Sequence, residues 1–102
     1  NEVMVAGGCV AQAEQALKNI VAILAEAGAA PADLVRLTWF VVEKREYLDQ
    51  RSELGKVYQR VIGNHFPAMS VVEVKGLIEE GAKLEIEATA MIGSHPTPSE
   101  AT

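Results

Sequence analysis

Residues 83–92 alternate between apolar and mostly polar side chains, and this alternation is the strongest constraint on the fold. The apolar set is Leu84, Ile86, Ala88, Ala90 and Ile92, and the mostly polar set is Lys83, Glu85, Glu87, Thr89 and Met91. Successive side chains of a β-strand point to opposite faces of the sheet. The segment is therefore predicted to be a strand with one face on the core and two carboxylates on the other.

Two amphipathic helices are predicted before this strand. Over residues 10–27 the apolar positions repeat at helical spacing, namely Val10, Ala13, Leu17, Ile20, Val21 and Leu24. The other side carries Gln12, Glu14, Gln15, Lys18 and Asn19, and Gly28 supplies the left-handed residue that ends the helix. A second helix is predicted over residues 45–62. Gly55 inside it costs about 1 kcal/mol relative to Ala, so close packing is expected there.

Three further segments have the composition of strands. They are residues 2–6, residues 35–42, which suit an interior strand, and residues 70–75. The order strand, helix, strand, helix, strand, strand predicts an α+β fold with both helices on one face of a mixed sheet. Residues 1–93 are predicted to form one domain, and residues 94–102 have the composition of a disordered tail.

Composition narrows the classes of function. The chain has 102 residues, a net charge of −5 and 49% hydrophobic residues. An acidic chain is poorly suited to nucleic acid, which is bound largely through cations, and no apolar window could span a bilayer. So much apolar surface in a small domain favours self-association. A single cysteine, Cys9, excludes an internal disulfide and indicates a reducing, cytoplasmic setting.

Two segments near the C-terminal end carry further information, residues 66–74 (FPAMSVVEV) and residues 83–88 (KLEIEA). They resemble the RidA/YjgF family of small trimeric enamine and imine deaminases, also called endoribonuclease L-PSP. In addition, residues 12–28 resemble the first helix of that family, and residues 33–42 resemble its Asp-Val-Val-Lys-Thr-Val-Phe strand. The order and spacing of these segments, which cover most of the chain, carry the resemblance.

The resemblance implies a chorismate-mutase-like fold and a homotrimer whose three sheets form a barrel-like core with helices outside. A small-molecule ligand would bind in a cleft between neighbouring subunits. Family members hold the substrate carboxylate with an arginine after Pro-Ala, and Met69 stands at that position here. The substrate-binding residues would be Met69, Ser70 and the Val71 N–H, and Glu85 would position the water that attacks the imine carbon. No cofactor and no metal are implied.

The replacement of the arginine by Met69 limits the activity that can be expected. A thioether has no charge and is a weak acceptor, and losing a charged hydrogen-bonded pair costs on the order of 2–5 kcal/mol. A deaminase or hydrolase of small imines or enamines is therefore expected, but with poor activity on typical 2-iminoacids. A non-catalytic small-molecule-binding trimer is the alternative. A chorismate-mutase-like enzyme ranks last, since that reaction needs several cations for a dicarboxylate.

Other reactive residues have simpler explanations. Cys9 is expected to be a small buried residue, His65 a surface loop residue, and Glu87 a structural or subunit-interface residue. No second His or Cys stands at metal-ligand spacing, so no metal site is expected. The basic residues on or beside the strands that could replace the missing guanidinium are Arg36, Lys75 and Lys83.

Overall fold

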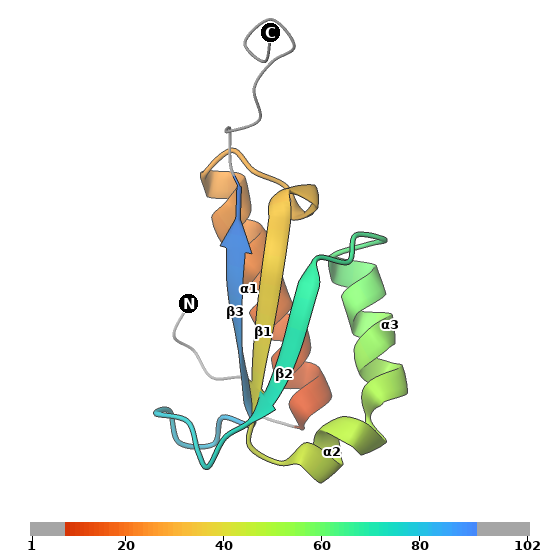
Figure 1. Ribbon diagram of the computed structural model, residues 1–102, viewed down its shortest axis with the longest axis vertical. Helices are drawn as coiled ribbons and strands as arrows, with labels where there is room; N and C mark the ends of the chain where they lie inside the picture. The colour runs from red at the N-terminus through yellow and green to blue at the C-terminus, as the bar shows by residue number, and fades with distance from the viewer. Residues whose placement is uncertain (1–7, 92–102) are drawn as a thin grey trace, which may run out of the picture.

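A three-stranded sheet packs against helices in the computed structural model, which describes residues 8–91 (Figure 1). In chain order the elements are α1 (Cys9–Glu26), a short 3-10 turn (Pro31–Asp33), β1 (Leu34–Val41), α2 (Lys44–Asp49), α3 (Arg51–Val61), β2 (Ala68–Glu73) and β3 (Leu84–Ala90). The predicted α+β fold is confirmed. The predicted strand at residues 2–6 and the predicted tail at residues 94–102 lie outside the described residues.

The sheet is mixed, as the sequence predicts. Its strand order is β2-β1-β3, with β1 parallel to β2 and antiparallel to β3. The predicted interior strand is therefore the central one, and within residues 8–91 β2 and β3 are the two edges. Figure 1 shows α1 behind the three strands and α3 beside β2.

One face of the sheet is turned to the helices and is buried. On β1 the side chains of Leu37, Trp39 and Val41 are at most 5% exposed and join the core. The alternation predicted for β3 is confirmed at the start of the strand, where Leu84 is buried and Ile86 partly buried whereas Glu85 and Glu87 are exposed; Ala88, which was predicted on the buried face, is exposed. Packing against this face explains why alternate positions of both strands are apolar.

Helix α1 packs its predicted apolar stripe on the core, with half of the stripe buried and half partly buried, and one polar residue is buried with it. Ala13, Leu17 and Leu24 are in the core. Gln12 was predicted on the polar side, and that assignment is wrong, since it is only 7% exposed. Gly28 follows the helix with φ +79° and ends it as predicted. Among the described helices none is long and apolar enough to cross a bilayer.

The second predicted helix is two helices. Gln50, with φ −104° and ψ 13°, separates α2 from α3, because these angles lie outside the helical range. The prediction of close packing at Gly55 is also wrong. A Cβ built on Gly55 meets nothing within 4 Å, so this glycine is exposed to solvent with no neighbour that requires it.

Candidate functional site

The residues predicted to bind substrate lie on β2, where all six residues are exposed. Met69 is opposite Leu37 and Val71 is opposite Trp39, so both side chains are on the helix side of the sheet. Ser70 is opposite Thr38 and lies on the other face. The predicted binding residues are thus divided between the two faces of one edge strand.

The backbone N–H of Val71 points away from the sheet. Val74 donates its N–H to the Val41 carbonyl over 2.8 Å, and the N–H groups along a strand alternate in direction. Val71, three residues earlier, therefore directs its N–H toward the free edge of β2. This direction is compatible with its predicted role as an anchor for a ligand.

Glu85 lies on the opposite face of the sheet from Met69. It is exposed on β3 and is opposite Phe40 of β1. Phe40 and Leu37 are three residues apart on one strand, so their side chains, and those of their neighbours in register, point to opposite faces. With β1 between β2 and β3, one copy of the chain does not bring Met69 and Glu85 together.

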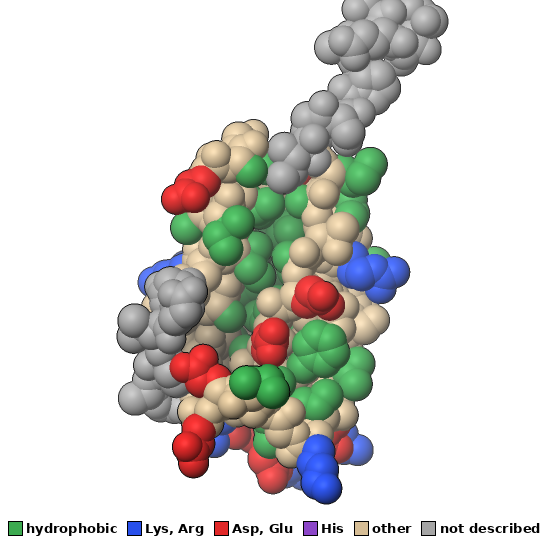
Figure 2. Space-filling model, turned by 90° about the vertical axis from the view of Figure 1, so that its left-hand side faces the viewer, with side chains coloured by type: hydrophobic (Ala, Val, Ile, Leu, Met, Phe, Trp, Pro, Cys, Tyr) green, Lys and Arg blue, Asp and Glu red, His purple; other side chains and the backbone are tan. Residues whose placement is uncertain are grey.

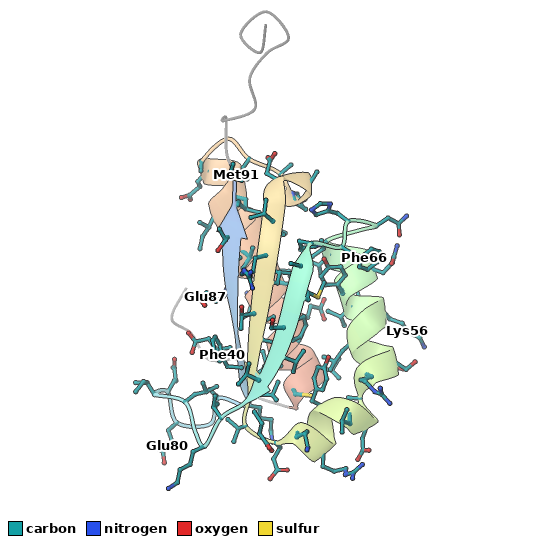
Figure 3. All side chains as sticks on the ribbon, in the orientation of Figure 1. Phe40, Lys56, Phe66, Glu80, Glu87 and Met91 are labelled. Carbon is teal, nitrogen blue, oxygen red and sulfur yellow. The ribbon has the colours of Figure 1, made fainter. Side chains whose placement is uncertain are left out.

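The sheet face turned away from the helices, here called the open face, holds nine residues in register. They form three rows: Ala68, Arg36 and Thr89; Ser70, Thr38 and Glu87; Val72, Phe40 and Glu85. In Figure 3 Phe40 and Glu87 both lie on the opposite side of the sheet from α3. The open face therefore combines two of the predicted site residues, Ser70 and Glu85.

The loop that enters β2 is held by His65, which the sequence had placed at the surface. His65 is partly buried, and its Nε2 lies 2.7 Å from the Leu34 carbonyl. The Tyr58 hydroxyl donates to the His65 carbonyl over 2.6 Å, and the Tyr58 and Phe66 rings stack with centroids 5.5 Å apart. Burial raises the pKa of Tyr58, which keeps the phenol protonated as a donor. His65 thus fixes the backbone of the loop that leads to Met69.

The start of β3 is held by a residue that sequence reasoning missed. Gln12 of α1 donates from Nε2 to the Gly81 carbonyl over 3.1 Å, and its Oε1 accepts the Lys83 N–H over 2.8 Å. The Lys83 ammonium pairs with Glu46 at 3.3 Å. These contacts position the strand two residues before Glu85. Lys83 is therefore engaged inside the chain and is a poor substitute for the missing arginine.

Cys9 is buried at the start of α1, as predicted, in a region that contains none of the residues predicted to bind substrate. Burial raises the pKa of its thiol, with the Glu46 carboxylate adding to the effect, so the thiol is neutral near pH 7 and a weak nucleophile. A hollow of about 450 Å³ lies here, lined by Gly8, Cys9, Val10, Ala11, Glu14, Glu46 and Gln50. It includes none of the predicted site residues.

Nowhere in residues 8–91 do three His, Cys, Asp or Glu side chains form a group that could hold a metal.

Comparison with known protein families identifies the family to which the chain belongs. The family model described as endoribonuclease L-PSP matches residues 1–92. The chain belongs to the RidA/YjgF family. It is 39% identical over 82 residues to a RutC family protein of Haemophilus influenzae, an alignment that covers 80% of the chain. It is 31% identical over 96 residues to the human protein named 2-iminobutanoate/2-iminopropanoate deaminase, covering 94% of the chain.

Solved structures of RidA/YjgF proteins have the same fold. Rv2704 of Mycobacterium tuberculosis, a YjgF/YER057c/UK114 family member, superposes with a TM-score of 0.73 at 35% identity, covering 86% of this chain and 71% of that one. TdcF of E. coli, solved with bound serine, gives a TM-score of 0.70 at 30% identity, covering 84% and 66%. The chain spans 62% of the Haemophilus relative and 66% of the human one.

Proposed function

We propose that this RidA/YjgF chain hydrolyses a small imine or enamine in a cleft between copies of itself. The observation that carries the proposal is Glu85, an exposed carboxylate on the open face, in a chain related to proteins named as iminoacid deaminases. Its one cysteine is free and buried, which is consistent with a cytoplasmic setting.

The reaction needs a water molecule and a group that accepts its proton. Water adds to the carbon of the protonated C=N bond while the Glu85 carboxylate takes a proton from the water, giving a neutral carbinolamine. Glu85 then returns this proton to the nitrogen. The C–N bond breaks as the hydroxyl group of the carbinolamine loses its proton to Glu85, and the products are a carbonyl compound and ammonia. An enamine enters the same sequence after protonation on carbon to the imine.

The positions of Met69 and Glu85 support a site shared between copies. They lie on opposite faces and on the two edge strands of the described sheet, so they can meet only across an interface. A ring of copies joined head to tail brings the β2 side of one copy to the β3 side of the next. We propose that the ring is a homotrimer, and that the small-molecule ligand binds at the interfaces between its subunits.

Met69 defines the substrate class of the proposed enzyme. Its side chain is 41% exposed on the edge strand, and a thioether offers an apolar, adaptable surface in place of a charge. A substrate without a carboxylate at this position fits better than a 2-iminoacid. The Val71 N–H, which faces the free edge, is available to bind a polar atom of the substrate.

Ammonia release tests the proposal. The protein is incubated with a 2-iminoacid generated in situ and, separately, with an imine that lacks a carboxylate. Release is expected from the second and weakly or not at all from the first. Glu85→Gln should lower the rate by about 100-fold or more, as removal of an acid–base group does. Glu80→Gln, a change in an exposed loop residue, is the matched control and should leave the rate unchanged.

A non-catalytic binding trimer is the second candidate, and Met69 is the observation that favours it. A family member without the carboxylate-binding cation could keep the cleft and lose the chemistry. No ammonia from either substrate, together with a small molecule bound beside Met69 in a crystal structure, would establish this alternative. Turnover of the 2-iminoacid as fast as that of the carboxylate-free imine would contradict both the role given to Met69 and this second candidate.

A further inference from the structure

Three exposed apolar side chains lie along β2 and just before it, on the side of the sheet that faces the helices. Phe66 is 64% exposed, Met69 41% and Val71 43%. Met69 and Val71 share this side because their neighbours in register on β1 are core residues. Phe66 lies there too, since its ring stacks on Tyr58 of α3 (Figure 3). These three residues are here called the β2 apolar strip.

The ring of Phe66 is held in place although most of it is exposed. It stacks on the buried Tyr58 ring with centroids 5.5 Å apart and an interplanar angle of 20°. The Tyr58 hydroxyl donates to the His65 carbonyl, and the His65 ring bonds the Leu34 carbonyl. A side chain that is fixed before a ligand arrives loses little conformational entropy on binding. Phe66 therefore presents a preformed aromatic surface.

The strip lies in an uncharged part of the chain. Residues 64–72 contain no Lys, Arg, Asp or Glu. The next residue on the same side of β2, Glu73, accepts the Lys44 N–H over 3.0 Å. The flank of the sheet beside β3 differs, because Figure 2 shows acidic side chains among the apolar ones there. A neutral apolar group therefore suits the strip better than a charged one.

The small size of the strip favours a small molecule over a protein. A stable protein interface involves roughly 20–30 residues on each side, whereas the strip consists of three side chains. The Val71 N–H at the free edge adds one polar donor beside them. Apolar side chains with a few placed polar groups are the usual lining of a small-molecule site.

We infer that the β2 apolar strip selects the substrate, and that the substrate is an imine with an aromatic group and no carboxylate. The aromatic group packs against Phe66 and Met69, and a polar atom of the substrate accepts the Val71 N–H. This inference rests on the hydrolysis proposed above and names its substrate class.

Binding of stable amides tests the strip without relying on turnover. Phenylacetamide has the aromatic group and no charge, acetamide lacks the aromatic group, and phenylacetate carries a carboxylate in place of the amide. Isothermal titration calorimetry should give phenylacetamide a Kd at least about 10-fold below that of acetamide, because a phenyl group leaves water on binding. Phenylacetate should also bind more weakly than phenylacetamide, because the strip has no cation. Equal Kd values for the two amides would overturn the inference.

Substitutions at Phe66 locate the aromatic group. Phe66→Ala should raise the Kd for phenylacetamide about 10-fold or more, whereas Phe66→Tyr keeps the ring and should bind like the parent. The control is Ile23→Ala, which removes another exposed apolar side chain, 63% exposed on α1, and should have no effect. Circular dichroism should show that each variant is folded. A Kd unchanged by Phe66→Ala would contradict the role given to the strip.

Three further results separate this inference from the proposals on which it rests. If Phe66→Ala changes the mass of the assembly in sedimentation equilibrium, a second copy of the chain covers Phe66 and the inference is overturned. If phenylacetamide binds through Phe66 but no imine releases ammonia, the proposed hydrolysis is refuted and the strip stands as a binding site. Ammonia released equally fast from aromatic and aliphatic imines without a carboxylate supports the hydrolysis and overturns the substrate class named here.

Discussion

In the proposed site shared between copies, the residue at position 69 decides which ligands can bind. Relatives with an arginine there can grip a planar carboxylate with two parallel N–H donors, whereas Met69 offers an apolar thioether. Its neighbour in register, Leu37, is fully buried in the core, so the backbone at this point is fixed and only the exposed end of the side chain differs. Restoring the cation should therefore restore the interaction.

Met69→Arg is expected to raise the affinity for a carboxylate ligand. A charged hydrogen-bonded pair recovered in a partly closed cleft contributes about 1.5–3 kcal/mol, which is roughly tenfold or more in Kd. Isothermal titration calorimetry with 2-oxobutanoate would measure the change. Met91→Arg, which adds the same charge at another exposed methionine, should have no effect. Equal affinities of Met69→Arg and the parent would show that the carboxylate site is absent.

Gly55 offers an independent test of the fold at the scale of one residue. It lies inside α3 with open space around its Cα, so Gly55→Ala should stabilise the chain by about 0.8–1 kcal/mol. Thermal unfolding followed by circular dichroism should show a Tm higher by about 3–8 °C.

Gly28→Ala is the comparison for that change. Gly28 has φ +79°, where a side chain is strained, so this variant should lower the Tm. A lower Tm for Gly55→Ala would mean that something packs against α3 at this position.

At the scale of the elements, α1 does more than cover the sheet. Its Gln12 amide bonds both the Gly81 carbonyl and the Lys83 N–H, so the helix fixes the loop from which β3 emerges. The orientation of Glu85 depends on where that strand begins. A buried side chain on a helix thus positions a proposed catalytic carboxylate without touching the substrate.

Gln12→Ala should lower the free energy of unfolding by about 1–3 kcal/mol, because it leaves two partly buried backbone groups without their partner. Chemical denaturation would measure the loss. Gln15→Ala on the same helix removes only a bond to Asn19 and should change stability by less than about 0.5 kcal/mol. Equal effects of the two variants would contradict the anchoring role of Gln12.

The periodicity of the sequence predicted the individual helices and strands better than it predicted how they contact one another. The alternation over residues 83–92 and the apolar stripe of α1 are local patterns. The stripe of α1 proved correct, and the alternation proved correct over the first half of β3 but not at Ala88, which is exposed. The break at Gln50 was missed because neither Gly nor Pro marks it in the sequence. The burial of Gln12 depends on its contacts with Gly81 and Lys83, which are distant in sequence, so no local signal exists for it. The same holds for Met69 and Glu85, since only the pairing of β1 with both neighbours shows that they lie on opposite faces.

For the whole molecule, the two edges and the open face of the sheet are the surfaces that the proposed assembly would cover. A single copy exposes β2 along its entire length and leaves the charges of the open face without partners among the described residues. Closing several copies into a ring would cover these surfaces and bring the two halves of the site together. Assembly and activity are therefore coupled in the proposed function.

The mass of the protein in solution tests this coupling most directly. Sedimentation equilibrium at micromolar concentration should give three times the 10.9 kDa mass of one chain. A mass of 10.9 kDa at every concentration would contradict the shared site, because Met69 and Glu85 would then remain on opposite faces of one sheet.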